Sequence, residues 1–143
     1  MGRVLGVDLG ERRIGLAMTD PGRTFASPLA TVPFASERRT AEHLAALCRE
    51  HGADQVVVGL PVRDDGTEGD NCARTRRIVD RLRALGIAAE PWDESWSTRD
   101  AADAMAGAGG GRQANRRRID RVAAALILRD WLESRRGGQE PSR

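Results

Sequence analysis

The chain has 143 residues and a formal net charge of +2, a length that fits one domain with a sizeable hydrophobic core. No apolar run approaches the roughly 18 to 20 residues needed to cross a bilayer, and the opening segment lacks the apolar stretch of a signal peptide, so we expect a cytoplasmic protein. Cys48 and Cys72 show neither CxxC nor Cys/His spacing, which leaves a zinc site or a disulfide framework unsupported. We expect two reduced, unreactive thiols, although Cys72 would be reactive if it lay in the loop before the next helix.

The basic side chains, 23 in all, are arginines, since the sequence contains no lysine. The planar guanidinium group suits phosphate and the arginines gather in short clusters, so we expect a phosphate-bearing partner, although genome composition alone would also produce such a bias. The three Trp and two Phe residues, with no Tyr, are too few to form a base-stacking platform. A nucleic-acid partner would therefore be bound through its backbone and its shape.

The first part of the chain predicts three strands. Residues 3–8 and 13–20 are apolar runs joined by the short turn LGER, which favours an antiparallel pair. Residues 27–34 form a third candidate strand, and its prolines indicate an edge position.

The middle of the chain predicts a helix over 37–51, a strand over 54–61 and a helix over about 68–85. Ser36 is a suitable N-cap for the first helix, which Gly52 would end. The strand is apolar throughout, as expected in the middle of a parallel sheet. Thr67 and Asp70 fit a capping box for the second helix, and Gly86 would end it.

The last part predicts a strand over 87–94, a short alanine-rich helix begun by Ser97 or Thr98, a flexible basic segment over 107–118 and a helix over 119–133. The basic segment contains four glycines that no core needs, and the last helix carries its apolar residues on one side. We expect residues 1–135 to form a single domain and residues 136–143 to be a disordered tail. The order of the elements predicts an α/β fold with a central mixed five-stranded sheet flanked by helices.

Acidic side chains fall at three places where the surroundings are apolar. Asp8 ends the first predicted strand, Glu94 ends the last, and Asp120 opens the final helix on a side with small apolar residues. Sites in such sheets form at the carboxyl ends of strands, and only one of Asp93 and Glu94 can share a face with Asp8. Two carboxylates about 4 Å apart repel by roughly 4 kcal/mol at an effective dielectric of 20, whereas a divalent cation would reverse that sign. The alternative for Asp8 is a turn cap that bonds its own backbone.

Four segments together resemble a known family: GVDLGERRIGLAMTD, VVVGLPVRDDGTEG, DESWST and NRRRIDRVAAALIL. In this order and spacing they resemble the YqgF family of pre-16S ribosomal RNA nucleases, also called Holliday-junction resolvase-like or RuvX proteins, over about residues 3–133. The resemblance implies an RNase H-like fold and a Mg²⁺ or Mn²⁺ site, with Asp8, Glu94 and Asp120 as metal ligands and catalytic residues. It also implies metal-assisted hydrolysis of phosphodiester bonds, foremost at the 5′ end of pre-16S ribosomal RNA during ribosome biogenesis.

One position departs from the family's pattern. Ser95 stands where the strand-end motif of the family usually has an arginine. The acidic residues are kept, so the loss would affect a phosphate contact or the orientation of Glu94, unless Arg99 or a loop arginine substitutes.

Several arginines would position the phosphates of a nucleic acid: Arg12, Arg13, Arg63, Arg112, Arg116, Arg117 and Arg118. Binding through them should weaken as the salt concentration rises. The last three stand near a predicted helix start, where an exposed cation is disfavoured by up to about 1 kcal/mol, so a phosphate would explain them. The alternative is a solvated charged loop.

Three glycines also have two interpretations. Gly10, Gly59 and Gly66 are either plain turn glycines or points where the backbone approaches phosphate or metal.

Three other functions are alternatives. A Holliday junction resolvase acting in DNA recombination would need two active sites and hence a homodimer, whereas trimming of a precursor RNA needs only a monomer. A catalytically weak nucleic-acid-binding factor would keep its function when Asp8 is replaced by Asn. An actin-like or sugar-kinase ATP site also begins with an Asp-X-Gly turn, but 143 residues leave no room for the second lobe of such proteins.

Overall fold

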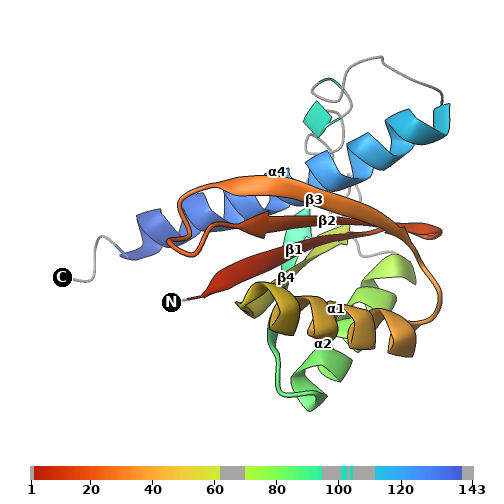
Figure 1. The fold of residues 1–143 in the computed structure, drawn as a ribbon, viewed down its shortest axis with the longest axis horizontal. Helices are drawn as coiled ribbons and strands as arrows, with labels where there is room; N and C mark the ends of the chain where they lie inside the picture. Colours follow the sequence, from red (N-terminus) through yellow and green to blue (C-terminus); the bar gives the residue numbers. More distant parts are fainter. Residues whose placement is uncertain (1, 62–69, 95–100, 103, 105–111, 140–143) are drawn as a thin grey trace.

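A five-stranded mixed sheet forms the centre of the protein in the computed structural model, which describes residues 2–61, 70–94, 101, 102, 104 and 112–139 (Figure 1). The elements in chain order are β1 (Arg3–Leu9), β2 (Arg13–Thr19), β3 (Ala26–Pro33), α1 (Glu37–His51), β4 (Ala53–Pro61), α2 (Asp70–Ala84), β5 (Ala88–Glu94) and α4 (Arg112–Gln139). The strand order is β3-β2-β1-β4-β5, with β1 antiparallel to β2 and parallel to β4. The predicted mixed sheet, its antiparallel first pair and the edge position of β3 are therefore confirmed.

Helices cover both faces of this sheet. Helices α1 and α2 pack on one face, and the long helix α4 crosses the other face over β1, β2 and β3 (Figure 1). The alternation of side chains along β1 follows this division: Leu5 and Val7 belong to the core under α1 and α2, whereas Val4 belongs to the core under α4. Positions in phase with Val4 therefore face α4, and Asp8 is one of them.

The caps of α1 are those that the sequence predicts. The Ser36 side chain accepts a hydrogen bond from the Arg39 N–H at 3.1 Å, which satisfies one of the free donors at the helix start. Gly52 has a φ of 73°, a left-handed conformation that glycine adopts without steric cost, and its N–H bonds the Cys48 carbonyl.

Helix α4 is longer than predicted at both ends. It begins at Arg112, so residues 112–118 are helical and not part of a flexible segment. These residues contain no glycine or proline, and arginine, glutamine and alanine have good helix propensity. At the other end the helix continues to Gln139, into the segment expected to be disordered. The predicted alanine-rich helix after Ser97 lies largely outside the described residues.

Both cysteines are buried. Cys48 on α1 and Cys72 on α2 are each 1% exposed, so Cys72 lies within a helix, as the predicted helix over about 68–85 implies, and the alternative of a loop thiol does not hold. Helix α2 begins at Asp70, two residues before Cys72, and this turns the thiol into the core.

Candidate active site

Asp8 lies near the carboxyl end of β1 and is 6% exposed. In the register of the hairpin it pairs with Gly15 of β2. Because paired residues of an antiparallel ladder project to the same face, Asp8 projects to the face where a side chain at Gly15 would lie. That face is the one covered by α4.

Gly15 brings α4 unusually close to the sheet. A Cβ atom at this position would lie 2.0 Å from the Asp120 carbonyl oxygen, so no residue with a side chain fits there without a shift of the helix. Asp120 is on the first third of α4 and is 4% exposed. The close contact at Gly15 thus brings a second buried carboxylate, from the far end of the chain, to the face on which Asp8 lies.

Arg13 at the start of β2 forms an ion pair with Asp120. The Nε atom of Arg13 donates to Oδ2 of Asp120 at 2.7 Å, with the two side chains 31% and 6% exposed. Arg13 was expected to contact phosphate, and here its partner is a carboxylate of the candidate site. The sequence offers no local signal for this pair, because the two residues are 107 positions apart.

Glu94 ends β5 at the same edge of the sheet as the end of β1. Its register partner is Pro61, the last residue of β4. Since β4 separates β5 from β1 and neighbouring strands lie about 4.8 Å apart, the backbones of β1 and β5 are roughly 10 Å apart. The Glu94 side chain is outside the described residues. Within the residues that the structure does describe, no three His, Cys, Asp or Glu side chains form a metal-binding group.

The turn between β1 and β2 is held by three contacts. The Gly10 N–H donates to the Arg13 carbonyl at 2.9 Å, and the Phe34 N–H donates to the Arg12 carbonyl at 2.9 Å. Nη2 of Arg74, on α2, donates to the Gly10 carbonyl, and its guanidinium lies 4.5 Å from the centre of the Phe34 ring. Burial lowers the pKa of Arg74 from its ordinary value, against the opposing effect of nearby Glu11 and Glu37. The sequence did not single out Arg74, whose partner Gly10 is 64 positions away.

Comparison with known proteins gives the family. Residues 2–134 match the family model described as "RuvX: Holliday junction resolvase". The chain belongs to the RuvX family.

Curated relatives extend over nearly the same length. A protein of Syntrophus aciditrophicus named "Putative pre-16S rRNA nuclease" is 39% identical over 92% of this chain and 89% of its own. A Chloroflexus aggregans protein of the same name is 39% identical over 93% of this chain and 94% of its own.

Solved structures show the same architecture. The Thermus thermophilus RuvC structure aligns with a TM-score of 0.58 at 12% identity, covering 94% of this chain and 96% of that one. At this identity the likeness concerns the fold alone. The RuvX-family chain therefore has the RNase H-like fold of RuvC-like resolvases, as the sequence resemblance implies.

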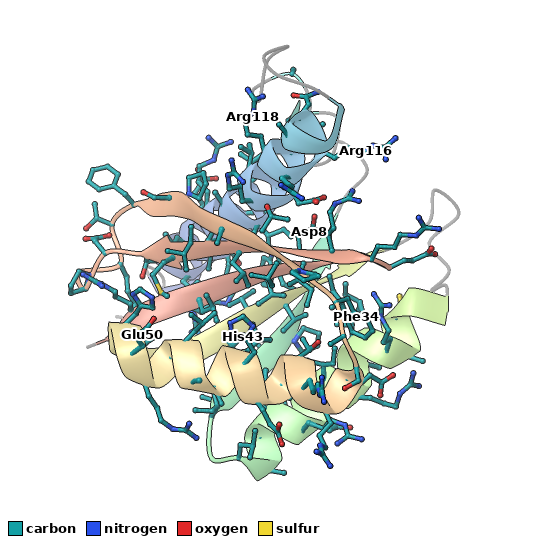
Figure 2. All side chains as sticks on the ribbon, turned by 45° about the vertical axis from the view of Figure 1, so that its right-hand side comes forward. Asp8, Phe34, His43, Glu50, Arg116 and Arg118 are labelled. Carbon is teal, nitrogen blue, oxygen red and sulfur yellow. The ribbon has the colours of Figure 1, made fainter. Side chains whose placement is uncertain are left out.

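The structure describes the side chains of some, but not all, of the arginines that were expected to bind phosphate in this RuvX-family chain. Arg12, Arg116 and Arg117 are exposed, and Arg118 is half-buried. Figure 2 shows Arg116 and Arg118 near the start of α4, on the face of the sheet that α4 covers. The start of the helix is fixed to β3, because Oγ1 of Thr31 donates to the Arg117 carbonyl at 2.5 Å. Arg63 and the Arg112 side chain are outside the described residues.

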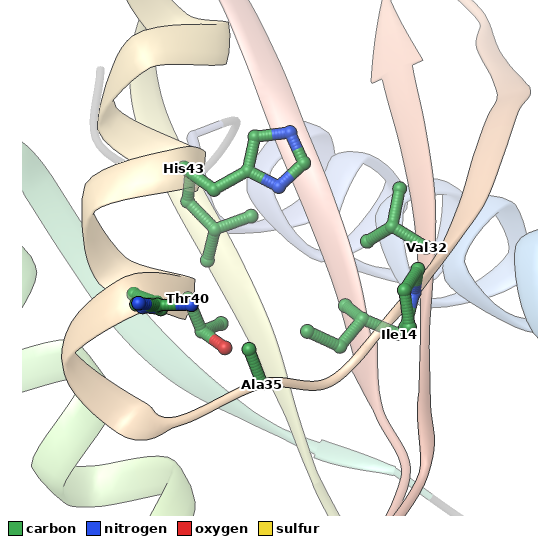
Figure 3. A pocket seen from close by; sticks show the side chains of 8 residues that line it. Ile14, Val32, Ala35, Thr40 and His43 are labelled. Carbon is green, nitrogen blue, oxygen red and sulfur yellow. The ribbon is translucent and has the colours of Figure 1, made fainter.

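A small hollow lies on the other face of the sheet, between α1 and strands β2 and β3 (Figure 3). It has a volume of about 150 Å³, and its lining includes Ile14, Val32, Thr40 and His43. Ile14 belongs to the core under α1 and α2, so this hollow is separated by the sheet from the buried carboxylates. It contributes no acidic side chain to the candidate site.

Proposed function

We propose that this chain is a metal-dependent endonuclease that hydrolyses phosphodiester bonds, with the 5′ end of pre-16S ribosomal RNA as its substrate. The observation that carries the proposal is the pair of buried carboxylates, Asp8 and Asp120, which the fold brings to one face of the sheet from opposite ends of the chain. The names of the curated relatives support the choice of substrate.

The donor set fits a divalent cation such as Mg²⁺ or Mn²⁺. Carboxylate oxygens are the ligands these hard cations prefer, and buried carboxylates require compensation by positive charge. In the structure a cation already occupies this role, since the Arg13 guanidinium lies 2.7 Å from Asp120. We assign Asp8, Asp120 and Glu94 as the ligands. Glu94 is in phase along β5 with Glu90 and Trp92, which contact side chains of α4, so its position belongs to the same face.

Bound there, the cation would supply a water of lowered pKa and would stabilise the charge of the leaving 3′ oxygen. The protein supplies position and surroundings. Asp8 and Asp120 are held in fixed places by the hairpin and by the contact at Gly15, and their burial keeps bulk water from competing for their oxygens. Arg12, Arg116 and Arg117, exposed near this site, would hold the phosphates on either side of the bond that is cut.

Parallel cleavage assays test the proposal. A labelled pre-16S RNA and a labelled four-way DNA junction are incubated with the protein in Mg²⁺ or Mn²⁺, with Asp8→Asn as the inactive variant and Asp80→Asn as the matched control on the exposed side of α2. Loss of a direct ligand should exceed the roughly 10- to 100-fold loss typical of groups that merely orient ligands. We expect metal-dependent cutting of the RNA that Asp8→Asn abolishes and Asp80→Asn keeps. Binding of RNA without cutting would instead indicate a nucleic-acid-binding factor.

Holliday junction resolution is the second candidate. The description of the family model favours it, and the RuvC fold neighbour has been solved with a Holliday junction substrate, with a TM-score of 0.54. Cutting of the junction alone would establish this function, and a symmetric homodimer would then be required to place two sites on the junction. Ribosomal RNA maturation would place the enzyme in the cytoplasm. No helix in the described part of the chain is long and apolar enough to cross a membrane.

A further inference from the structure

The Arg13–Asp120 pair combines a deeply buried acid with a base that still reaches solvent. The Asp120 side chain is 6% exposed, and the Arg13 side chain is 31% exposed. Loss of an ion-pair partner is costly for a carboxylate as buried as Asp120, whereas a guanidinium at the exposure of Arg13 can be rehydrated. The two partners therefore differ in how much they depend on the contact.

Arg13 and a divalent cation would compete for the same carboxylate. The Nε–H of Arg13 donates to Oδ2 of Asp120, one of the oxygens that a metal ligand has to offer. A doubly charged ion compensates buried carboxylates more fully than a singly charged guanidinium, and it repels that guanidinium at short range. Both effects favour removal of Arg13 when the ion binds.

Exchange of Arg13 requires no movement of the backbone. Its carbonyl is held by the Gly10 N–H at 2.9 Å, and its Cα pairs with Pro33 of β3. Rotation about side-chain bonds is enough to carry the guanidinium away from Asp120. The neighbouring Arg12 is exposed, so the rim of the hairpin already carries one arginine that faces solvent.

We propose that Arg13 is an exchangeable counter-ion of Asp120. Its guanidinium compensates the buried carboxylate when no divalent cation is bound, and the cation displaces it toward the rim of the site, where it is free to bind a substrate phosphate. Binding of metal and binding of phosphate would thereby strengthen each other. The inference rests on the proposed function only in taking a divalent cation as the ligand of Asp120.

Metal binding to variants is the first test. Free Mn²⁺ is followed by electron paramagnetic resonance during titration of the metal-free protein, for the wild type, Arg13→Gln, Arg13→Lys and the neighbouring Arg12→Gln. Arg13→Gln should bind Mn²⁺ roughly fivefold or more tightly than the wild type, the lower range of typical coupling between two ligands. Arg12→Gln, which removes the same charge one position away, should stay within about twofold if the coupling is specific to the pair. Arg13→Lys should fall between the wild type and Arg13→Gln.

The opposite sign would overturn the inference. If Arg13→Gln binds Mn²⁺ as weakly as the wild type, or more weakly, Arg13 orients Asp120 for the metal and does not compete with it. If the wild type still cleaves RNA in Mn²⁺ in that case, the proposed function is kept and only the inference about Arg13 is rejected. Absence of Mn²⁺ binding in the wild type and in every variant would reject the metal site itself.

A second measurement uses only the wild-type protein, so it does not depend on whether a variant folds. In wild-type protein labelled with ¹⁵N, the Nε–H signal of Arg13 reports its hydrogen bond to Asp120, and diamagnetic Mg²⁺ is titrated in. We expect this signal to move to the position typical of solvated arginine while that of Arg12 stays in place. An Arg13 signal that keeps its position at saturating Mg²⁺ would contradict displacement.

Discussion

At the scale of single residues, burial of charge is the feature that needs a cause. Asp8 and Asp120 are the acidic residues that are buried within the described part of the chain. An isolated buried carboxylate is costly, so a fold that gains nothing from such groups would place an apolar or neutral residue there. The ion pair with Arg13 compensates Asp120, and the proposed cation would compensate both.

Gly15 is the residue that allows this arrangement. Gly15→Ala puts a methyl group 2.0 Å from the Asp120 carbonyl, which is backbone and cannot move aside alone. We expect a loss of about 3 kcal/mol or more in the free energy of unfolding, measured by urea denaturation. Gly22→Ala is the control, since its methyl group would meet no atom closer than 3.3 Å, and it should change stability by less than about 0.5 kcal/mol. Equal effects of the two substitutions would show that α4 moves freely over β2.

The Cys48 thiol gives a prediction about pH. Burial raises its pKa from 9.0 to about 11, because the thiolate would lose its hydration. Folding therefore favours the neutral thiol, and this stabilisation is complete below pH 9 and declines as the pH rises from 9 through 11. The free energy of unfolding of Cys48→Ala should fall less steeply than that of the wild type between pH 8.5 and about 10.5. At pH 8 the native wild type should resist a thiol reagent that labels it rapidly in urea, and rapid native labelling would contradict the buried placement.

At the scale of elements, the β1–β2 hairpin depends on a helix that is far away in sequence. Arg74 of α2 reaches the Gly10 carbonyl and stacks on Phe34, so the turn that carries Asp8 and Arg13 is fixed from the opposite face of the sheet. The ladder bonds between β1 and β2 set the register of the hairpin. The contact with α2 determines where its tip lies.

Arg74→Lys tests this contact. Lysine has no planar fork, so it would lose the stacking on Phe34 and the geometry of the bond to Gly10. We expect a loss of about 1–2 kcal/mol in the free energy of unfolding, and Arg81→Lys, at an exposed position of the same helix, should be close to neutral. Hydrogen exchange at the Gly10 amide should also accelerate in Arg74→Lys alone. An unchanged exchange rate would mean that the turn holds its position without α2.

The elements that the sequence predicted well are those with local causes. Ser36 and Gly52 define α1, and the prolines of β3 mark an edge strand, because caps and proline geometry act within a few residues. The predicted start of α4, residue 119, lies after its observed start at Arg112, because the glycines of 107–111 and the arginines after them suggested one flexible segment. The Arg13–Asp120 pair was not predicted at all, because only the packing of α4 on β2 brings those positions together.

At the scale of the whole molecule, the two faces of the sheet differ in the residues that they bury. The face under α1 and α2 carries a continuous apolar core, whereas the face under α4 combines an apolar core with both buried acids. Arg116 and Arg118 lie near the start of α4 (Figure 2), and Arg12 is exposed in the turn between β1 and β2, next to the Arg13 that pairs with Asp120. A nucleic acid that reaches the carboxylates would therefore pass these arginines first.

The salt dependence of RNA binding tests that path. With Asp8→Asn as the background to prevent cutting, affinity for a single-stranded RNA is measured over a range of salt concentrations. Each phosphate contact on a single strand contributes about 0.7 to the slope of log affinity against log salt, so replacing Arg116 and Arg117 together by Gln should lower the slope by roughly 1.4. Arg129→Gln removes an exposed charge further along the same helix and should leave the slope unchanged. Weaker binding with the wild-type slope would mean that Arg116 and Arg117 act on the helix and make no phosphate contact.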